Sequence, residues 1–180
     1  MPSNLATLPA LSTQYFKPKH ASTNTLNEIG SLRASIWQDN QHSDRQKACQ
    51  HVWLEEADKH AHLWAVTSEA GMIATARLCI SNNLNHLPEQ ELYDGLELPA
   101  PFATMGRLVV APSWRGKGIA SALIRERLNL CDDLGVKSLL LDCPEHRVPV
   151  MQRYGFSALK LPQAGILFPD TRFVVMGRFN

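Results

Sequence analysis

Residues 107–124, RLVVAPSWRGKGIASALI, constrain the fold of this chain more than any other stretch. An apolar run that suits a buried strand ends at Pro112, and Gly116 and Gly118 follow before apolar residues return at helical spacing. The segment therefore predicts a strand, a tight turn and a helix that no side chain caps. The unpaired N–H groups and partial positive charge of such a helix start form a site for an anion, and glycines let the backbone approach a pyrophosphate closely.

The rest of the chain alternates between strand and helix patterns. Thr25 and Glu28 have the spacing of a capping box, and Ser43 and Gln46 repeat it, so each pair predicts a helix start. We expect helices at 25–38, 43–56, 118–134 and within 147–156, and strands at 13–18, 62–68, 72–80, 102–110, 136–143, near Phe156 and at 172–179. This order predicts a mixed α/β (α+β) fold.

The length suits one domain that spans residues 1–180, with residues 1–12 as a loose leader. Residues 81–101 form a long, mostly polar connection, and connections of this length are often functional. The helix expected at 118–134 has an apolar stripe that ends before Gly135 and consists of Ala120, Ile124, Leu128 and Cys131.

Composition excludes several classes of protein. Eighteen Lys and Arg against 17 Asp and Glu leave a net charge of +1, which argues against a nucleic-acid partner. No apolar run reaches the roughly 18 residues of a membrane helix, and no signal-peptide pattern opens the chain, so we expect a cytoplasmic protein without a membrane partner. Cys49, Cys79, Cys131 and Cys143 are too widely spaced for a zinc site, and we expect no metal.

Two familiar phosphate-binding patterns fail at the glycine-rich turn. The nucleoside-triphosphatase loop would need a glycine at Ala111 and a magnesium-binding hydroxyl at Gly118. The dinucleotide fingerprint would need a glycine at Ser121 and a position in an opening βαβ unit. The anion expected here therefore belongs to another class of ligand.

The turn resembles the acyl-coenzyme A turn of the GNAT acetyltransferases, [QR]-x-x-G-x-[GA], which reads Arg115, Gly116, Lys117, Gly118, Ile119, Ala120 in this chain. The resemblance is strongest over residues 102–156, where a later RYGF segment also fits the family. It implies a GNAT fold, with a mixed sheet of about six or seven strands that splays at the acyl-CoA site and about four flanking helices. It further implies that the pyrophosphate rests on Arg115 to Ala120 and that the pantetheine arm pairs with the main chain of Leu108, Val109 and Val110.

The catalytic groups are less well defined by the resemblance. The tyrosine that serves as acid in many family members corresponds to Met151, and the usual asparagine corresponds to Pro144. An alkylamine with a pKa near 10.4 needs a base, since only about one part in a thousand is neutral at physiological pH. The candidates for catalysis are Asp142, Glu145 and Tyr154. A water chain and a nucleophilic Cys143 are alternatives.

The resemblance implies an N-acetyltransferase that moves an acetyl group from acetyl-CoA to a primary amine of a small molecule or peptide, by direct attack in a ternary complex. The alternative is a GNAT-fold sensor or regulatory protein that binds acyl-CoA without transferring the acyl group, and Pro144 and Met151 favour it. An acyl-homoserine-lactone synthase, on a related fold, is a third alternative. The sequence is also compatible with a homodimer.

Overall fold

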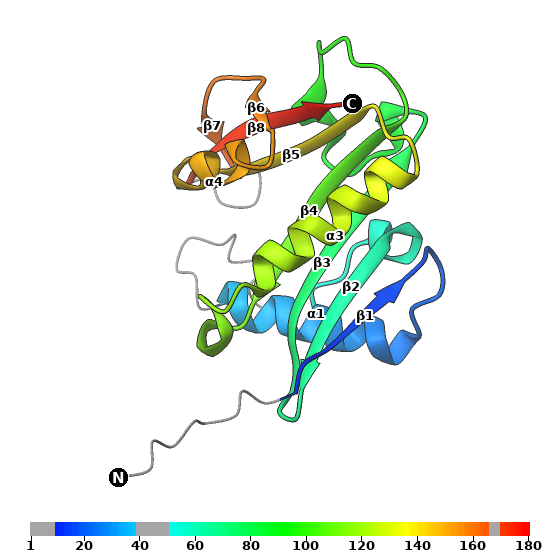
Figure 1. Cartoon of the computed structure of the whole chain (residues 1–180), viewed down its shortest axis with the longest axis vertical. Helices are drawn as coiled ribbons and strands as arrows, with labels where there is room; N and C mark the ends of the chain where they lie inside the picture. Colours follow the sequence, from blue (N-terminus) through cyan, green and yellow to red (C-terminus); the bar gives the residue numbers. More distant parts are fainter. Residues whose placement is uncertain (1–9, 39–50, 166–169) are drawn as a thin grey trace.

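The computed structural model describes residues 10–38, 51–165 and 170–180. Their strands form one mixed sheet in the order β1-β2-β3-β4-β5-β8-β6, with β7 also paired to β8 (Figure 1). The strands are β1 (Ser12–Phe16), β2 (His62–Ser68), β3 (Gly71–Ser81), β4 (Phe102–Val110), β5 (Ser138–Pro144), β6 (Ser157–Ala158), β7 (Gln163–Ala164) and β8 (Arg172–Phe179). The mixed α/β class is confirmed. The strand expected near Phe156 corresponds to β6, whereas β7, with two residues, was not predicted.

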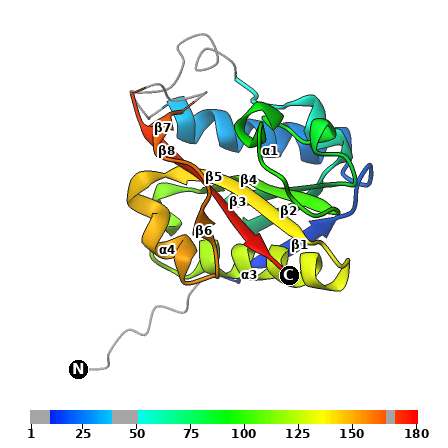
Figure 2. The same ribbon diagram turned by 90° about the horizontal axis from the view of Figure 1, so that it is seen from above.

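Helices cover both faces of the sheet. Figure 2 shows α1 (Thr23–Gln38) over one face and α3 (Ile119–Asp133) and α4 (Val148–Gln152) over the other. These are the three α-helices within the described ranges, where we predicted about four. Short 3-10 turns are η1 (Glu56–His60), η2 (Leu84–His86), η3 (Gln90–Tyr93), η4 (Pro112–Trp114) and η5 (Glu145–Arg147).

Two predicted helix boundaries need correction. Most of the helix expected at 43–56 lies outside the described residues, and its predicted end is wrong because Glu55 has extended backbone angles and η1 starts after it. Helix α1 starts at Thr23 rather than Thr25. The hydroxyl of Ser22 accepts a hydrogen bond from the backbone N–H of Thr25 at 3.1 Å, so Ser22 is the residue that caps this helix.

Helix α3 packs its apolar stripe on the sheet. Its buried apolar residues are Ile119, Leu123, Ile124, Leu128 and Cys131, whereas Ala120 is only half-buried. The predicted stripe missed Arg127, which is also buried. Its Nε donates to the carbonyl of Leu123 at 3.0 Å and its Nη1 donates to the carbonyl of Arg77 at 3.3 Å, and burial lowers the pKa of this guanidinium to about 9.

The connection from β3 to β4 was expected to be mostly polar, but it contributes to the core. Leu87, Leu92 and Tyr93 are buried, and the segment lies on the same face of the sheet as α1 (Figure 2). Two hydrogen bonds join this connection to other parts of the fold. Lys160 Nζ donates to the carbonyl of Asp94 at 2.9 Å, and Ser138 Oγ donates to the carbonyl of Pro99 at 2.7 Å. This connection is therefore held against the sheet along its length.

Strand β4 leaves its parallel partner early. It pairs with β5 only through Phe102, Ala103 and Thr104, and Figure 1 shows β5 and β8 turning away from it beyond that point. On its other side β4 stays paired with β3, but two residues, Arg107 and Leu108, occupy the place opposite one residue of β3. This is a β-bulge, and Arg107 adopts the left-handed conformation with φ of +52°. The bulge lies just after the point where the two strands separate.

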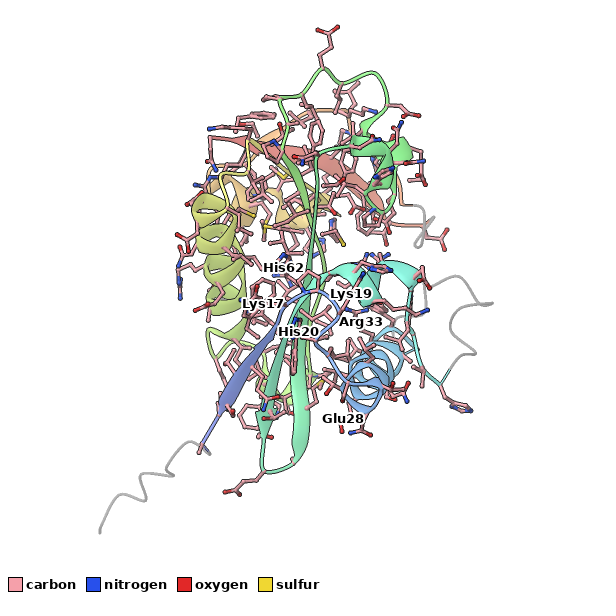
Figure 3. The ribbon with its side chains drawn as sticks, turned by 90° about the vertical axis from the view of Figure 1, so that its right-hand side faces the viewer. Lys17, Lys19, His20, Glu28, Arg33 and His62 are labelled. Carbon is pink, nitrogen blue, oxygen red and sulfur yellow. The ribbon has the colours of Figure 1, made fainter. Side chains whose placement is uncertain are left out.

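Six charged side chains of alternating sign connect α1 to this bulge. The chain of contacts consists of Arg33–Asp58 (2.8 Å), Asp58–Arg77 (3.4 Å), Arg77–Glu55 (2.6 Å), Glu55–Arg107 (2.7 Å) and Arg107–Glu89. Arg33 and Asp58 are fully buried, and Figure 3 shows Arg33 on the α1 side of the sheet. Because the charges balance three to three, the network is neutral as a whole. It joins α1, η1, β3, β4 and the 82–101 connection.

We expect Asp58→Asn to lower the free energy of unfolding by about 3–5 kcal/mol, because Arg33 would keep its charge in a buried position without a counter-ion. Urea denaturation measures the change. Glu56→Gln is the matched control on the same 3-10 turn: its pair with Lys59 is exposed and should leave stability nearly unchanged. Equal losses in the two variants would contradict the importance of the buried pair.

Candidate active site

The separation of β4 from β5 creates a gap with two chemically different faces. Side chains alternate along a strand, so Leu141 and Cys143 of β5 join the core under α3, as does Met105 of β4. Leu140 points to the opposite face, where it packs with residues of the 82–101 connection, and Asp142 follows it on that face. One side of the gap is therefore apolar, and a carboxylate lies on the other.

The open end of the gap leads to the glycine-rich turn. Gly116 and Gly118 have φ of +74° and +81°, conformations that glycine adopts at no steric cost, and a Cβ at either position would meet no atom within 4 Å. Gly118 occupies the N-cap position of α3, and no side chain bonds to the helix start. No side chain therefore caps the first N–H groups of α3, as an anion site requires.

Cationic side chains border this turn. The ammonium of Lys117 lies 5.3 Å from the ring centroid of Trp114, and this indole also packs against the core. The Nε of Arg115 donates to the carbonyl of Val110 at 3.1 Å. Both charges are exposed, and both lie beside the uncapped helix start. The turn, Arg115 to Ala120, and the strand end, Leu108 to Val110, are adjacent, as the sequence interpretation requires.

Asp142 is a carboxyl group near the gap whose pKa is raised. Burial and, to a smaller extent, the nearby Glu89 carboxylate raise its pKa to about 6, although Arg107 acts in the opposite direction. A carboxylate with this pKa is mostly ionised at neutral pH and binds a proton more strongly than an exposed one. Asp142 therefore has the acidity of a general base.

Arg107 brings Glu89 and Glu55 to the same face. Burial alone would lower the pKa of Arg107, but its bonds to Glu55 and the charge of Glu89 outweigh burial and raise it. For the carboxyl group of Glu55, burial acts in the other direction and would raise the pKa. The bonds and charges of Arg107 and Arg77 outweigh burial and hold this pKa at about 2. Both groups are thus ionised across the physiological pH range, and they fix the bulge electrostatically.

The structure separates the other catalytic candidates from this face. Glu145 is exposed on η5, and its carboxylate lies 3.7 Å from Arg172. Tyr154 is partly buried against the main core. Burial raises the pKa of the Cys143 thiol to about 11, and the thiol lies 3.6 Å from the sulfur of Met176. A thiol in that state is a poor nucleophile.

The two departures from the family pattern occupy different environments. Met151 of α4 is buried in the main core, so the position that carries the acid in many relatives is filled by packing in this chain. Pro144 ends β5 and pairs with Phe173 of β8.

Sequence reasoning missed two residues of this face, Arg107 and Tyr93. A sequence signal existed only for Arg107, a single charge inside the apolar strand FATMGRLVV. Its partners Glu55 and Glu89 lie 52 and 18 residues away in sequence, so no local spacing could have paired them.

A cavity of about 490 Å³ lies beside this face. It is bounded by η1, by β3 and by the 82–101 connection, and its lining includes His60, Cys79, His86, Glu89 and Glu91. Among the described residues no three His, Cys, Asp or Glu side chains gather as metal ligands would. No helix in the described ranges is long and apolar enough to cross a membrane.

Solved structures of low sequence identity share this fold. Escherichia coli ElaA is 17% identical, with a TM-score of 0.69 over 94% of this chain and 99% of its own. An acyl-CoA N-acyltransferase from Pseudomonas aeruginosa is 18% identical, with a TM-score of 0.69 over 94% and 99%. The AHL synthase LasI is 14% identical, with a TM-score of 0.70 over 94% and 89%.

No curated protein matches the sequence. Residues 26–156, more than half of the chain, match the acetyltransferase (GNAT) family. That match, together with the splayed mixed sheet, the uncapped glycine turn and the shared fold, places the protein in the GNAT family of acyltransferases, which use acyl-CoA as a co-substrate.

Proposed function

We propose that the protein is an N-acetyltransferase that transfers the acetyl group of acetyl-CoA to a primary amine of a small molecule or peptide. The observation that carries this proposal is the position of Asp142 on one face of a gap whose open end leads to an uncapped helix start. In this proposal the pyrophosphate binds at Arg115 to Ala120. The pantetheine arm follows the edge of Leu108 to Val110 that does not pair with β5.

The proposed reaction is a direct attack within a ternary complex. Asp142 accepts a proton from the acceptor ammonium, and the freed amine attacks the thioester carbonyl carbon. When the tetrahedral intermediate collapses, the carbon–sulfur bond breaks and the coenzyme leaves as a thiolate. The second proton of the attacking nitrogen passes to water, which leaves a neutral amide. No side-chain acid is required for this step, because a thiol with a pKa of about 8.5 is a good leaving group near neutral pH. That property makes the absence of a phenol at Met151 tolerable.

The cavity beside η1 provides the proposed place for the acceptor. Glu89 lines it and is also bound to Arg107, so the cavity borders the face that carries Asp142. An ammonium ion is more favourable than an anion in a cavity that carries several carboxylates. The acceptor amine would thus approach from the α1 face, opposite the core under α3.

A screen of amines with acetyl-CoA, in which release of the coenzyme thiol is measured, tests the proposed activity. Tight binding of acetyl-CoA without transfer to any amine would instead support the sensor alternative, which the residues at Pro144 and Met151 favour.

Coenzyme binding at the turn predicts a large effect of Gly118→Val. The added side chain would enter the open space in front of the helix start and weaken acetyl-CoA binding ten-fold or more, on the scale of two lost charge-assisted hydrogen bonds. Calorimetry measures the affinity. Gly135→Val is the matched control, since Gly135 lies after the other end of α3 with φ of +67° and equally open surroundings. Unchanged affinity in a folded Gly118→Val protein would refute this site.

A base at Asp142 predicts that Asp142→Asn lowers kcat by about a hundred- to ten-thousand-fold while acetyl-CoA affinity changes less than two-fold. Wild-type kcat/KM should rise with pH through about 6 as the carboxylate ionises, and the variant should lack this limb. Glu145→Gln, an exposed carboxylate three residues further on, should behave as wild type. A pH profile that is the same in wild type and Asp142→Asn would exclude Asp142 as the base.

Asp142 should also lower the stability of the fold at neutral pH. Its pKa of about 6 in the folded state lies above the ordinary 3.8, so the folded state binds more protons between these values, and stability falls as pH rises through that window. We expect Asp142→Asn to raise the free energy of unfolding by about 1–2 kcal/mol at pH 8. The gain should disappear near pH 4. Urea denaturation at both pH values measures it, and a loss of stability at pH 8 would contradict the burial cost.

A further inference from the structure

The closed end of the gap is the end at which β4 still pairs with β5, and it leaves an acyl group only one direction in which to extend. Beyond the last β4–β5 pair, Thr104 with Leu140, the face under α3 is filled by the buried side chains Met105, Leu139 and Leu141. If the thioester lies in the gap, as the proposed function requires, additional carbons must therefore pass toward the α1 face. What fills that face decides which acyl groups fit.

Tyr93 is the side chain that fills the α1 face at the closed end of the gap. It is 2% exposed on η3 and packs in a cluster with Leu92, Leu140 and Val175. Burial raises the pKa of its phenol, and the charges of Asp142 and Glu89 raise it further. The ring therefore lies beside Leu140, at the closed end of the gap, and also near the carboxylate that we propose as the base.

The 82–101 connection holds Tyr93 firmly. Glu89, four residues before it, is bound to Arg107 of the β4 bulge, and Asp94, the next residue, is bound through its carbonyl to Lys160. Because both flanks are bonded to other parts of the fold, the ring cannot move aside without breaking these contacts. Its neighbours Asp142, Glu89 and Arg107 are charged, and methylene groups gain nothing from contact with ionised groups.

We propose that Tyr93 determines acyl-chain length: its ring forms the floor of the acyl site and restricts the protein to short acyl groups such as acetyl and propionyl. The inference rests on the proposed function, because it takes the β4–β5 gap as the acyl site. It assigns to Tyr93 a role in specificity and none in proton transfer. The volume of the ring, and not its hydroxyl, is the property that matters.

The test compares acetyl-, butyryl- and hexanoyl-CoA with wild type, Tyr93→Leu and Tyr93→Phe. Calorimetry measures the affinity of each thioester, and thiol release with one accepted amine gives kcat/KM. We expect wild type to favour acetyl-CoA over butyryl-CoA at least ten-fold and Tyr93→Leu to reduce this ratio at least ten-fold. Tyr93→Phe keeps the ring and should keep the ratio.

Leu92→Ala is the matched control, because it opens space in the same buried cluster at the neighbouring residue. It should lower stability but leave the chain-length ratio unchanged. Thermal unfolding of each variant shows that the comparison is made on folded protein, and Tyr93→Met replaces Tyr93→Leu if the latter does not fold.

The outcomes separate this inference from the proposed function. Equal affinity of wild type for all three thioesters, or a ratio unchanged in folded Tyr93→Leu or Tyr93→Met, would overturn the role of Tyr93 alone. Failure of every thioester to bind would overturn the proposed function and this inference together. Binding that discriminates by chain length through Tyr93, without transfer to any amine, would support this inference and oppose the transferase proposal.

Discussion

Separation of β4 from β5 after three residue pairs is the constraint on which the rest of this structure depends. Beyond these pairs β4 has one neighbouring strand instead of two, and the bulge at Arg107 stabilises it there. The left-handed backbone at this residue costs free energy, and the guanidinium offsets that cost through its bonds to Glu55 and Glu89. The gap is thus maintained by ion pairs on one face and by the α3 core on the other.

The same network links the gap to the segments that surround it. Glu55 precedes η1, Glu89 belongs to the connection after β3, and both bind one arginine. A buried network of balanced charge adds little net stability, but it defines one arrangement, because removal of any member leaves the network with an uncompensated charge. The cavity, Tyr93 and the proposed base Asp142 therefore keep fixed positions relative to the gap.

Asp142 shows how stability and proposed chemistry conflict at one residue. The burial that gives this carboxyl group a pKa of about 6 also makes its ionised form unfavourable in the folded state. A chain selected for stability alone would place an apolar residue there, in line with Leu140 on the same face of β5. A base that operates near neutral pH requires this loss of folding stability, and the stability of the surrounding core allows the fold to tolerate it.

Sequence alone determined the elements with strong local patterns. The hairpin of β2 and β3, strand β4, helix α3 and strand β8 were predicted within a few residues, because apolar periodicity and glycine turns are local signals. The glycine-rich turn and its family resemblance were equally local. The cap of α1 at Ser22 is also a local contact, three residues before the N–H of Thr25. Tertiary structure alone decided that Arg127 is buried and that Arg107, Glu89, Tyr93 and Asp142 share one face of the gap. These residues are far apart in sequence, and only sheet register and the path of the 82–101 connection bring them together, which no spacing along the chain encodes.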